Sequence, residues 1–166
     1  MSDDADDETI IECYVDSDWA GKLANRKSTS GGALVVGGAC LKSWSRTQKT
    51  RALSSAEAEY YAIVSGAAEA LGFQALAQDL GFDLTIRVHT DSKGARGICC
   101  RRGLGKTRHV EVRFLWVQQA LKAGRLQIAK ILGTQNPVDH LTKPLGRAEM
   151  IRQIQMLGGR VEINCA

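Results

Sequence analysis

The chain has 166 residues, of which 44% are hydrophobic and 24% charged, and this composition is ordinary for a single globular domain. No apolar run approaches the roughly 20 residues needed to cross a bilayer, and the N-terminus lacks the basic-then-apolar order of a secretory signal. The five cysteines include no C-x-x-C pair, which argues against a disulfide framework or a zinc site. We therefore expect an intracellular protein that contacts no membrane and is monomeric as an isolated domain.

The charge is distributed unevenly along the chain. The formal net charge is +4, but five acids crowd residues 3–8, and without them 22 basic residues stand against 13 acidic ones. Residues 1–9 are expected to form an acidic, disordered tail. The segment 93–113 contains one acid and seven basic residues, namely Lys93, Arg96, Arg101, Arg102, Lys106, Arg108 and Arg113. Such a segment is typical of a surface that meets phosphates, although an isolated basic stretch is more often a solvated face.

Three strands are expected before the first helix. Alternating apolar residues predict a strand over 10–15 that ends at Asp16, and strands over 31–38 and 39–45 are joined by a Gly-Gly hairpin signal. Ser54, with Glu57 three residues later, has the spacing of a capping box. An apolar stripe follows, with Gly81 behind it, so the pattern predicts a long helix that ends near residue 80.

Strands and helices then alternate. A strand over 84–91 ends at Asp91, a basic region follows, and a helix over 109–124 precedes a strand over 125–132. Asn136 and Pro137 suit the N-cap and first position of a closing helix, which would place Asp139 in its first turn.

This order of elements predicts an α/β fold. The sheet is mixed and five-stranded, with the first three strands antiparallel, strands one, four and five parallel, and helices on its faces. We expect the fold to occupy residues 10–145, and residues 146–166 to form a C-terminal helical extension.

Acidic residues are predicted to converge at one end of this sheet. They are Asp16 and Asp91 after two neighbouring strands, Glu57 or Glu59 in the long helix, and Asp139 near the last helix. Carboxylates so close would repel one another unless divalent cations lay among them, and hard oxygen ligands suit Mg²⁺ or Mn²⁺. Each acid alone has a simpler explanation as a turn former, a helix cap or a partner of a helix dipole. Their common location favours a two-metal site for phosphodiester hydrolysis.

Six segments between Tyr14 and Leu145 resemble, in order, the ribonuclease H domain that ends the polyprotein of Copia-type LTR retrotransposons. They read DSDWAG, RKSTSGG, SWSRTQKTRALSSAEAEYYAI, HTDSKGA, TRHVEVRF and NPVDHLTKPL. The resemblance implies a ribonuclease H-like fold that cuts the RNA strand of RNA–DNA hybrids with two Mg²⁺ ions, for which Mn²⁺ can substitute. It also implies a reverse transcriptase domain as a partner within the polyprotein.

The resemblance also implies a set of four metal ligands, Asp16, Glu59, Asp91 and Asp139. Glu57 already suits the capping box, and residues two apart on a helix diverge by about 200°, so only one of the two glutamates can face the metals. The loop histidine common in this family is missing from LGTQNP. His140 is expected to point elsewhere, and His109 to cap a helix.

Substrate contacts are expected from small polar groups that meet ribose hydroxyls and from groups that hold phosphates. The candidates are Asn25, Arg26, Ser28, Thr29, Arg101, Arg102, Lys106 and Arg108. Trp44 is equally compatible with the core and with a nucleotide contact.

The sequence is compatible to different degrees with three other functions. The segment GLGKT lacks the first glycine of a P-loop, because Cys100 stands there, and no strand precedes it. A catalytically silent nucleic-acid-binding domain of the same fold is the main alternative, and retention of all four acids argues against it. An integrase-like or exonuclease relative is a third, and the early position of the helix glutamate disfavours integrase.

Overall fold

The structure is a computed structural model that describes residues 9–22, 26–102, 105 and 114–160. Most of the predicted acidic tail, the candidate residues Asn25, Lys106 and Arg108, and His109 lie outside the described residues. Within the described ranges, no helix combines the length and apolar character needed to cross a membrane.

One sheet with the strand order β3-β2-β1-β4-β5 forms the centre of the fold. The central strand β1 (Ile10–Lys22) pairs antiparallel with β2 (Lys27–Val36) and parallel with β4 (Thr85–Thr90). The edges are β3 (Ala39–Thr47), antiparallel to β2, and β5 (Gln127–Lys130), parallel to β4. The predicted mixed α/β sheet is therefore confirmed.

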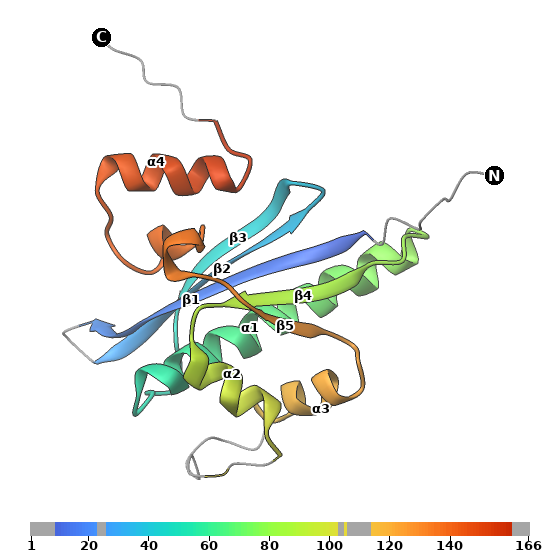
Figure 1. The fold of residues 1–166 in the computed structure, drawn as a ribbon, viewed down its shortest axis with the longest axis horizontal. Helices are drawn as coiled ribbons and strands as arrows, with labels where there is room; N and C mark the ends of the chain where they lie inside the picture. Colours follow the sequence, from blue (N-terminus) through green and yellow to red (C-terminus); the bar gives the residue numbers. More distant parts are fainter. Residues whose placement is uncertain (1–8, 23–25, 103–104, 106–113, 161–166) are drawn as a thin grey trace.

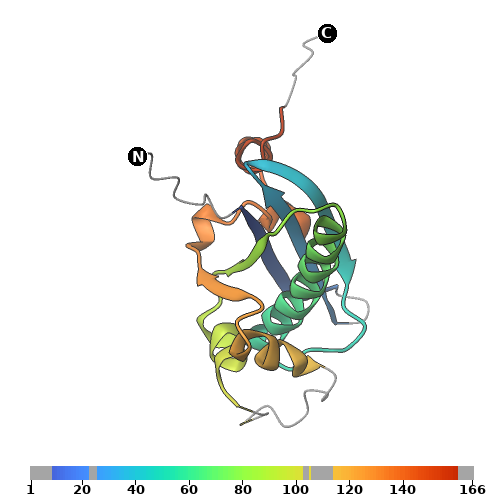
Figure 2. The same cartoon turned by 90° about the vertical axis from the view of Figure 1, so that its right-hand side faces the viewer.

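Helix α1 (Ser55–Asp79) runs along one face of this sheet, as Figures 1 and 2 show. The helices α2 (Lys93–Cys100) and α3 (Trp116–Lys122) lie together beside the first turns of α1. Apolar side chains of β1 and β4 meet α1, α2 and α3 in the larger of two buried clusters.

The opposite face of the sheet is covered by the C-terminal part of the chain. Two 3₁₀ turns, η2 (Gly133–Gln135) and η3 (Asp139–Leu141), precede helix α4 (Arg147–Met156). A smaller apolar cluster forms here around Ala33, Val35, Val138 and Leu157. The C-terminal segment covers this face only thinly, and it brings Asp139 to the sheet.

Two predicted elements differ from the structure. The first strand continues past Asp16 to Lys22, because β2 pairs with it as far as Asp18 and, after a register shift, again at Lys22, whereas the parallel pairing with β4 ends at Tyr14. Asn136 does not cap an α-helix: its side-chain Nδ2 donates a hydrogen bond of 3.0 Å to the Val15 carbonyl, and only the short turn η3 follows. Helix α3 begins at Trp116, and residues 109–113 of the predicted helix lie outside the described residues.

Helix α1 approaches the sheet closely through glycine. A Cβ atom on Gly66 would lie 2.4 Å from Val15 Cγ1 and 3.0 Å from Cys13 Sγ, whereas a Cβ on Gly72, in the same helix, would meet nothing within 4 Å. The position of the helix over β1 therefore depends on the missing side chain at residue 66.

We predict opposite effects for the two alanine substitutions. Gly66→Ala should lower the free energy of unfolding by about 1–3 kcal/mol, because it overpacks the contact with β1. Gly72→Ala should raise it by up to about 1 kcal/mol, because alanine favours the helix and meets no neighbour. Urea unfolding of both variants checks this, and equal stability gains would contradict the close approach of α1.

Candidate active site

Two aspartates reach the same level of the sheet from adjacent parallel strands. The last parallel pair between β1 and β4 is Tyr14 with His89, and Asp16 and Asp91 each lie two residues further along. Asp16 is still inside β1 and is only 3% exposed, whereas Asp91 follows the end of β4 and is half-buried. Strand register therefore brings these two carboxylates together.

The third carboxylate comes from the first turns of α1. Ser54 caps this helix, since its Oγ accepts from the Glu57 N–H, and the Glu57 carboxylate accepts from the Leu53 N–H at 3.1 Å and from the Tyr61 hydroxyl at 2.6 Å. The Glu57 carboxylate is thus hydrogen-bonded at the start of the helix and does not face the aspartates. Glu59 points toward the sheet instead, where its Oε1 accepts from the backbone N–H of Ser17 at 3.2 Å.

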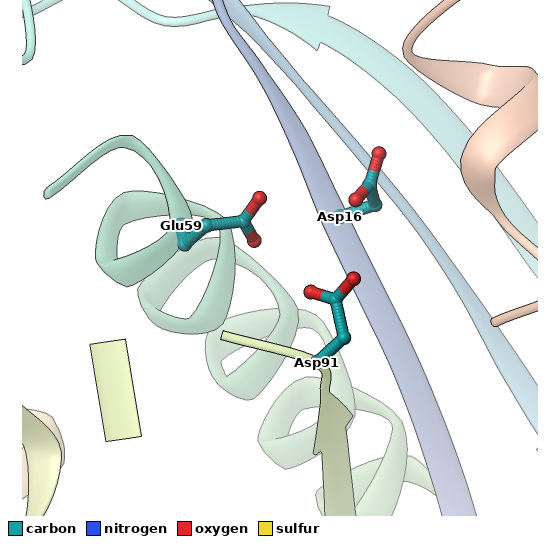
Figure 3. A group of neighbouring side chains, drawn as sticks. All are labelled: Asp16, Glu59 and Asp91. Atoms are coloured by element: carbon teal, nitrogen blue, oxygen red, sulfur yellow. The ribbon is translucent and has the colours of Figure 1, made fainter. Parts of the chain in front are cut away.

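Asp16, Glu59 and Asp91 form one compact acidic group. One carboxylate oxygen from each lies within 4.8 Å of the other two, and Figure 3 shows the three side chains directed toward one another from β1, α1 and the end of β4. This spacing suits a shared cation better than direct hydrogen bonds between carboxylates.

The electrostatics of the group favour protonation in the absence of a cation. Burial, reinforced by the charges of Asp16 and Asp91, raises the pKa of Glu59 to about 8. Burial also raises the pKa of Asp16 to about 6, although a hydrogen bond from Thr142 opposes the shift. The pKa of Asp91 is raised by burial and by the charge of Asp139. Negative charge is therefore concentrated here beyond what the protein itself neutralises.

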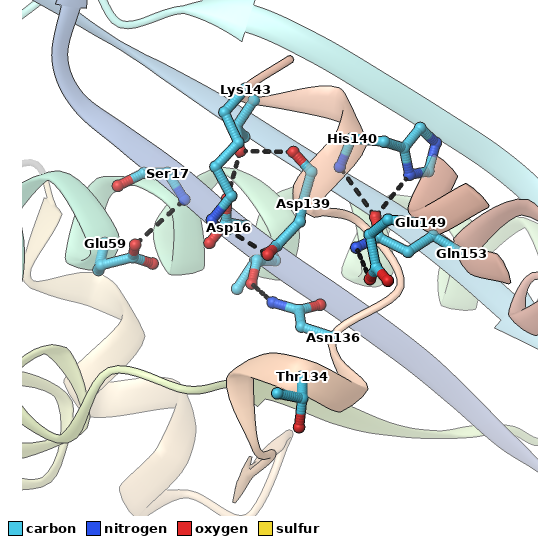
Figure 4. A network of polar contacts seen from close by, with 12 residues as sticks. Asp16, Ser17, Glu59, Thr134, Asn136, Asp139, His140, Lys143, Glu149 and Gln153 are labelled. Atoms are coloured by element: carbon cyan, nitrogen blue, oxygen red, sulfur yellow. Dashed lines mark hydrogen bonds and ion pairs between the residues drawn. The ribbon is translucent and has the colours of Figure 1, made fainter. Parts of the chain in front are cut away.

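Asp139 lies beside the group but is not one of its three members. Its Oδ2 forms an ion pair of 3.0 Å with Lys143, one turn along the chain, and its charge still raises the pKa of Asp16 and of Asp91. Figure 4 shows Asp139 and Lys143 next to Asp16. Thr142 completes this side, because its hydroxyl lies within hydrogen-bond distance of two acceptors, Asp16 Oδ2 and the Asp139 carbonyl. Of the four predicted ligands, the structure thus groups three and holds the fourth nearby through a lysine.

The donor atoms fit a divalent metal ion. Glu59 Oε2 and Asp139 Oδ1 are buried without a hydrogen-bond partner among the described residues. Buried carboxylate oxygens without partners are costly, and a hard cation is the ligand that would compensate several of them at once. The acidic group can therefore bind a metal, with oxygen donors only.

The predicted substrate contacts fall in different environments. Arg26 is exposed at the β1–β2 turn and Thr29 is partly exposed, but Ser28 is fully buried, and its Oγ accepts from the Ala20 N–H at 3.1 Å. The prediction for the Ser28 side chain is therefore corrected, because its hydroxyl supports the hairpin. Arg101 and Arg102 line a groove of about 710 Å³ between α2 and α3.

The structure also places Trp44, which the sequence left open, and His140, which was expected to point away from the metals. Trp44 is 6% exposed and packs against the glycine backbone at Gly32 and Gly66, so it belongs to the core. His140 pairs with Gln153, where its Nδ1 lies 3.0 Å from the Gln153 Oε1. It takes no part in the acidic group.

Sequence reasoning missed Lys143, Thr142 and Ser17 as supporting residues. Lys143 and Thr142 follow Asp139 by four and three positions, a helical spacing that was the one available signal. Ser17 contributes its backbone N–H, which leaves no trace in the sequence.

No protein-family model matches the chain. The chain is 32% identical over 149 residues to the "Retrovirus-related Pol polyprotein from transposon TNT 1-94" of Nicotiana tabacum, a match that covers 87% of this chain and 11% of that protein. It is 28% identical over 140 residues to the corresponding polyprotein from transposon RE1 of Arabidopsis thaliana, over 82% of this chain and 10% of that protein. The chain corresponds to a region of copia-type retrotransposon Pol polyproteins. It spans about a tenth of the length of these relatives.

Solved structures show that this Pol region has a ribonuclease H-like fold. RNase H1 from the archaeon Halobacterium salinarum superimposes with a TM-score of 0.55 at 22% identity, covering 80% of this chain and 93% of that one. LC11-RNase H1 in complex with an RNA/DNA hybrid superimposes with a TM-score of 0.50 at 19% identity, covering 80% and 93%. These likenesses concern the fold.

We predict that Glu59→Gln stabilises the metal-free Pol region at alkaline pH. Because the pKa of Glu59 is raised from its ordinary 4.5 to about 8, the folded state binds more protons than the unfolded state between these values, and stability falls as pH rises through this range. Removing the titrating group should remove this loss, on the order of 1 kcal/mol or more at pH 8. Thermal unfolding of both chains in EDTA at pH 5 and pH 8 measures this loss of stability.

Glu149→Gln is the control outside the acidic group, because Glu149 is a partly exposed glutamate on α4 whose pKa is lowered by hydrogen bonds from Arg152 and Gln153, away from the range of pH 5 to pH 8. It should leave the pH dependence of the unfolding temperature unchanged. A divalent metal should raise the stability of the unsubstituted chain at pH 8, and it should raise the stability of Glu59→Gln by less. Identical pH profiles for the unsubstituted chain and Glu59→Gln would contradict the buried, crowded position of Glu59.

Proposed function

We propose that this Pol region is a ribonuclease H that hydrolyses the RNA strand of RNA–DNA hybrids endonucleolytically. The observation that carries the proposal is the group formed by Asp16, Glu59 and Asp91 on a ribonuclease H-like sheet. We propose these three as metal ligands and catalytic residues, with Asp139 as the fourth. The proposed cofactor is a pair of Mg²⁺ ions, with Mn²⁺ as a substitute.

When bound, two such ions activate a water molecule and stabilise the leaving oxygen of a phosphodiester. The protein side of this chemistry is positioning. The Thr142 hydroxyl donates to one oxygen of Asp16, and the Ser17 N–H donates to one oxygen of Glu59, and these bonds orient both carboxylates. Lys143 binds Asp139 and limits the repulsion among the acids before metal enters.

The proposed substrate is supported by charge as well as by fold. Arg26, Arg101 and Arg102 are cationic residues on the described surface, and Lys106 and Arg108 add to the same basic segment of the sequence. Phosphate contacts of this kind supply most of the affinity for nucleic acid, without reading sequence. The structural neighbour LC11-RNase H1 has been crystallised with an RNA/DNA hybrid. Within the longer polyprotein, a reverse transcriptase domain is the proposed partner.

We predict that Asp91→Asn abolishes hybrid cleavage. The substitution removes one negative charge from the group of three carboxylates while it keeps the side-chain shape, so metal binding and transition-state stabilisation are lost together. A 5′-labelled RNA in a hybrid, incubated with Mg²⁺, should be cut by the unsubstituted chain. We expect at least about a hundredfold lower rate for the variant, and no cleavage in EDTA.

Asp18→Asn is the matched control, because Asp18 lies on the same strand two residues from Asp16 and is not a member of the acidic group. It should retain most of the activity, and the DNA strand should stay intact throughout. Cleavage that persists in EDTA or in Asp91→Asn would contradict the proposed site. Hybrid binding without cleavage by the unsubstituted chain would favour a catalytically silent binding domain.

A further inference from the structure

Trp19 is an exposed aromatic side chain on the strand that carries Asp16. It is 47% exposed, whereas Trp44 is 6% exposed and Trp116 is partly packed against the core. Its indole Nε1 donates a hydrogen bond of 3.1 Å to the Ala52 carbonyl, so the ring is held in one orientation. A large apolar face is thus presented to the outside in a fixed position.

The hairpin is irregular next to Trp19. The pairing of β1 with β2 shifts register between Asp18 and Lys22, and Ala20 adopts a left-handed conformation with a φ of 54°. The buried Ser28 hydroxyl accepts from the Ala20 N–H and supports this distortion. A β-bulge of this kind redirects side chains, and left-handed alanine is unfavourable by roughly 1–2 kcal/mol. The hairpin therefore tolerates a strained residue next to Trp19.

The surroundings of the indole are basic and apolar. Ala52, which accepts the Trp19 hydrogen bond, lies between Arg51 and Leu53, both exposed, and Leu53 is 67% exposed. Lys49 is exposed two residues before Arg51. An exposed aromatic face held against a segment that carries exposed cations is a combination that can bind polynucleotides through sugar and base contacts together with phosphate pairing.

Trp19 also lies close to the acidic group. It is three residues beyond Asp16, which corresponds to roughly 10 Å along an extended strand. Ser17, which lies between Asp16 and Trp19, donates its backbone N–H to the Glu59 carboxylate. Ala52, which accepts the hydrogen bond from Trp19, lies two residues before Ser54, the N-cap of α1. Trp19 and the acidic group therefore both lie against the start of α1, Trp19 through Ala52 and the acidic group through Glu59.

We propose that Trp19 is a substrate-contact residue whose indole face packs against a sugar or base of the polynucleotide, with Lys49 and Arg51 meeting its phosphates. This inference rests on the proposed function, since it takes the same nucleic acid as the ligand. The positive charge of Lys49 and Arg51 favours a polynucleotide as the ligand, because an apolar protein partner would have to bury these cations without compensation.

Tryptophan fluorescence tests this in the Asp91→Asn chain, which should bind without cutting. An RNA–DNA hybrid added in Mg²⁺ should quench the emission, and it should also protect the chain from acrylamide, because Trp19 is the most exposed of the three indoles. Trp19→Phe in the same background should lose most of the quenching and bind the hybrid at least about fivefold more weakly. Trp116→Phe is the matched control and should keep both the quenching and the affinity.

The outcomes separate the inference from the function. Hybrid binding with unchanged acrylamide accessibility, or with equal affinity and quenching in Trp19→Phe, would overturn the role of Trp19 and leave the proposed function standing. No hybrid binding by the unsubstituted chain in a mobility-shift assay would overturn both. If Trp19→Phe is unstable, the acrylamide measurement on the Trp116→Phe chain still decides, because Trp44 is buried and Trp19 is then the exposed indole that acrylamide reaches.

Discussion

Repulsion among three carboxylates in a mostly buried space is the constraint on which the arrangement of the site depends. Asp16 and Glu59 are 3% and 9% exposed, and burial with mutual charge raises the pKa of both. The protein offsets part of this cost with a hydroxyl from Thr142, a backbone N–H from Ser17 and the ammonium group of Lys143 near Asp139. These groups do not neutralise all of the negative charge that the three carboxylates carry when ionised, and a divalent cation is the simplest group that does so.

The scaffold that holds these charges together is rigid for identifiable reasons. Parallel pairing of β1 with β4 sets Asp16 and Asp91 at one level, and close packing through Gly66 lets α1 lie near enough for Glu59 to reach them. The cap at Ser54 fixes where the helix starts, and hence which glutamate faces the sheet. Asn136 ties the segment before Asp139 to the Val15 carbonyl. The site is thus built on strands and a helix, with only Asp139 on a short turn.

Much of this arrangement could be predicted from the sequence because it depends on periodic patterns. Strand alternation and helix spacing placed Asp16, Asp91 and either Glu57 or Glu59 at one end of one sheet, and the family resemblance together with the capping signature favoured Glu59. The helix expected after Asn136 was wrong, because a tertiary hydrogen bond to β1 competes with capping. The register shift around Ala20 and the orientation of Trp19 were not predictable, since they involve tertiary hydrogen bonds, from the Ala20 N–H to the buried Ser28 Oγ and from the Trp19 indole to the Ala52 carbonyl.

The most direct test of the account is to locate the metal. Crystals of the chain soaked in Mn²⁺ should give an anomalous diffraction peak within coordination distance of the carboxylate oxygens of Asp16, Glu59 and Asp91. A second peak shared with Asp139 would complete the proposed pair of ions. Mn²⁺ bound elsewhere, with these carboxylates uncoordinated at saturating metal and neutral to alkaline pH, would contradict the claim that a cation is what balances the group.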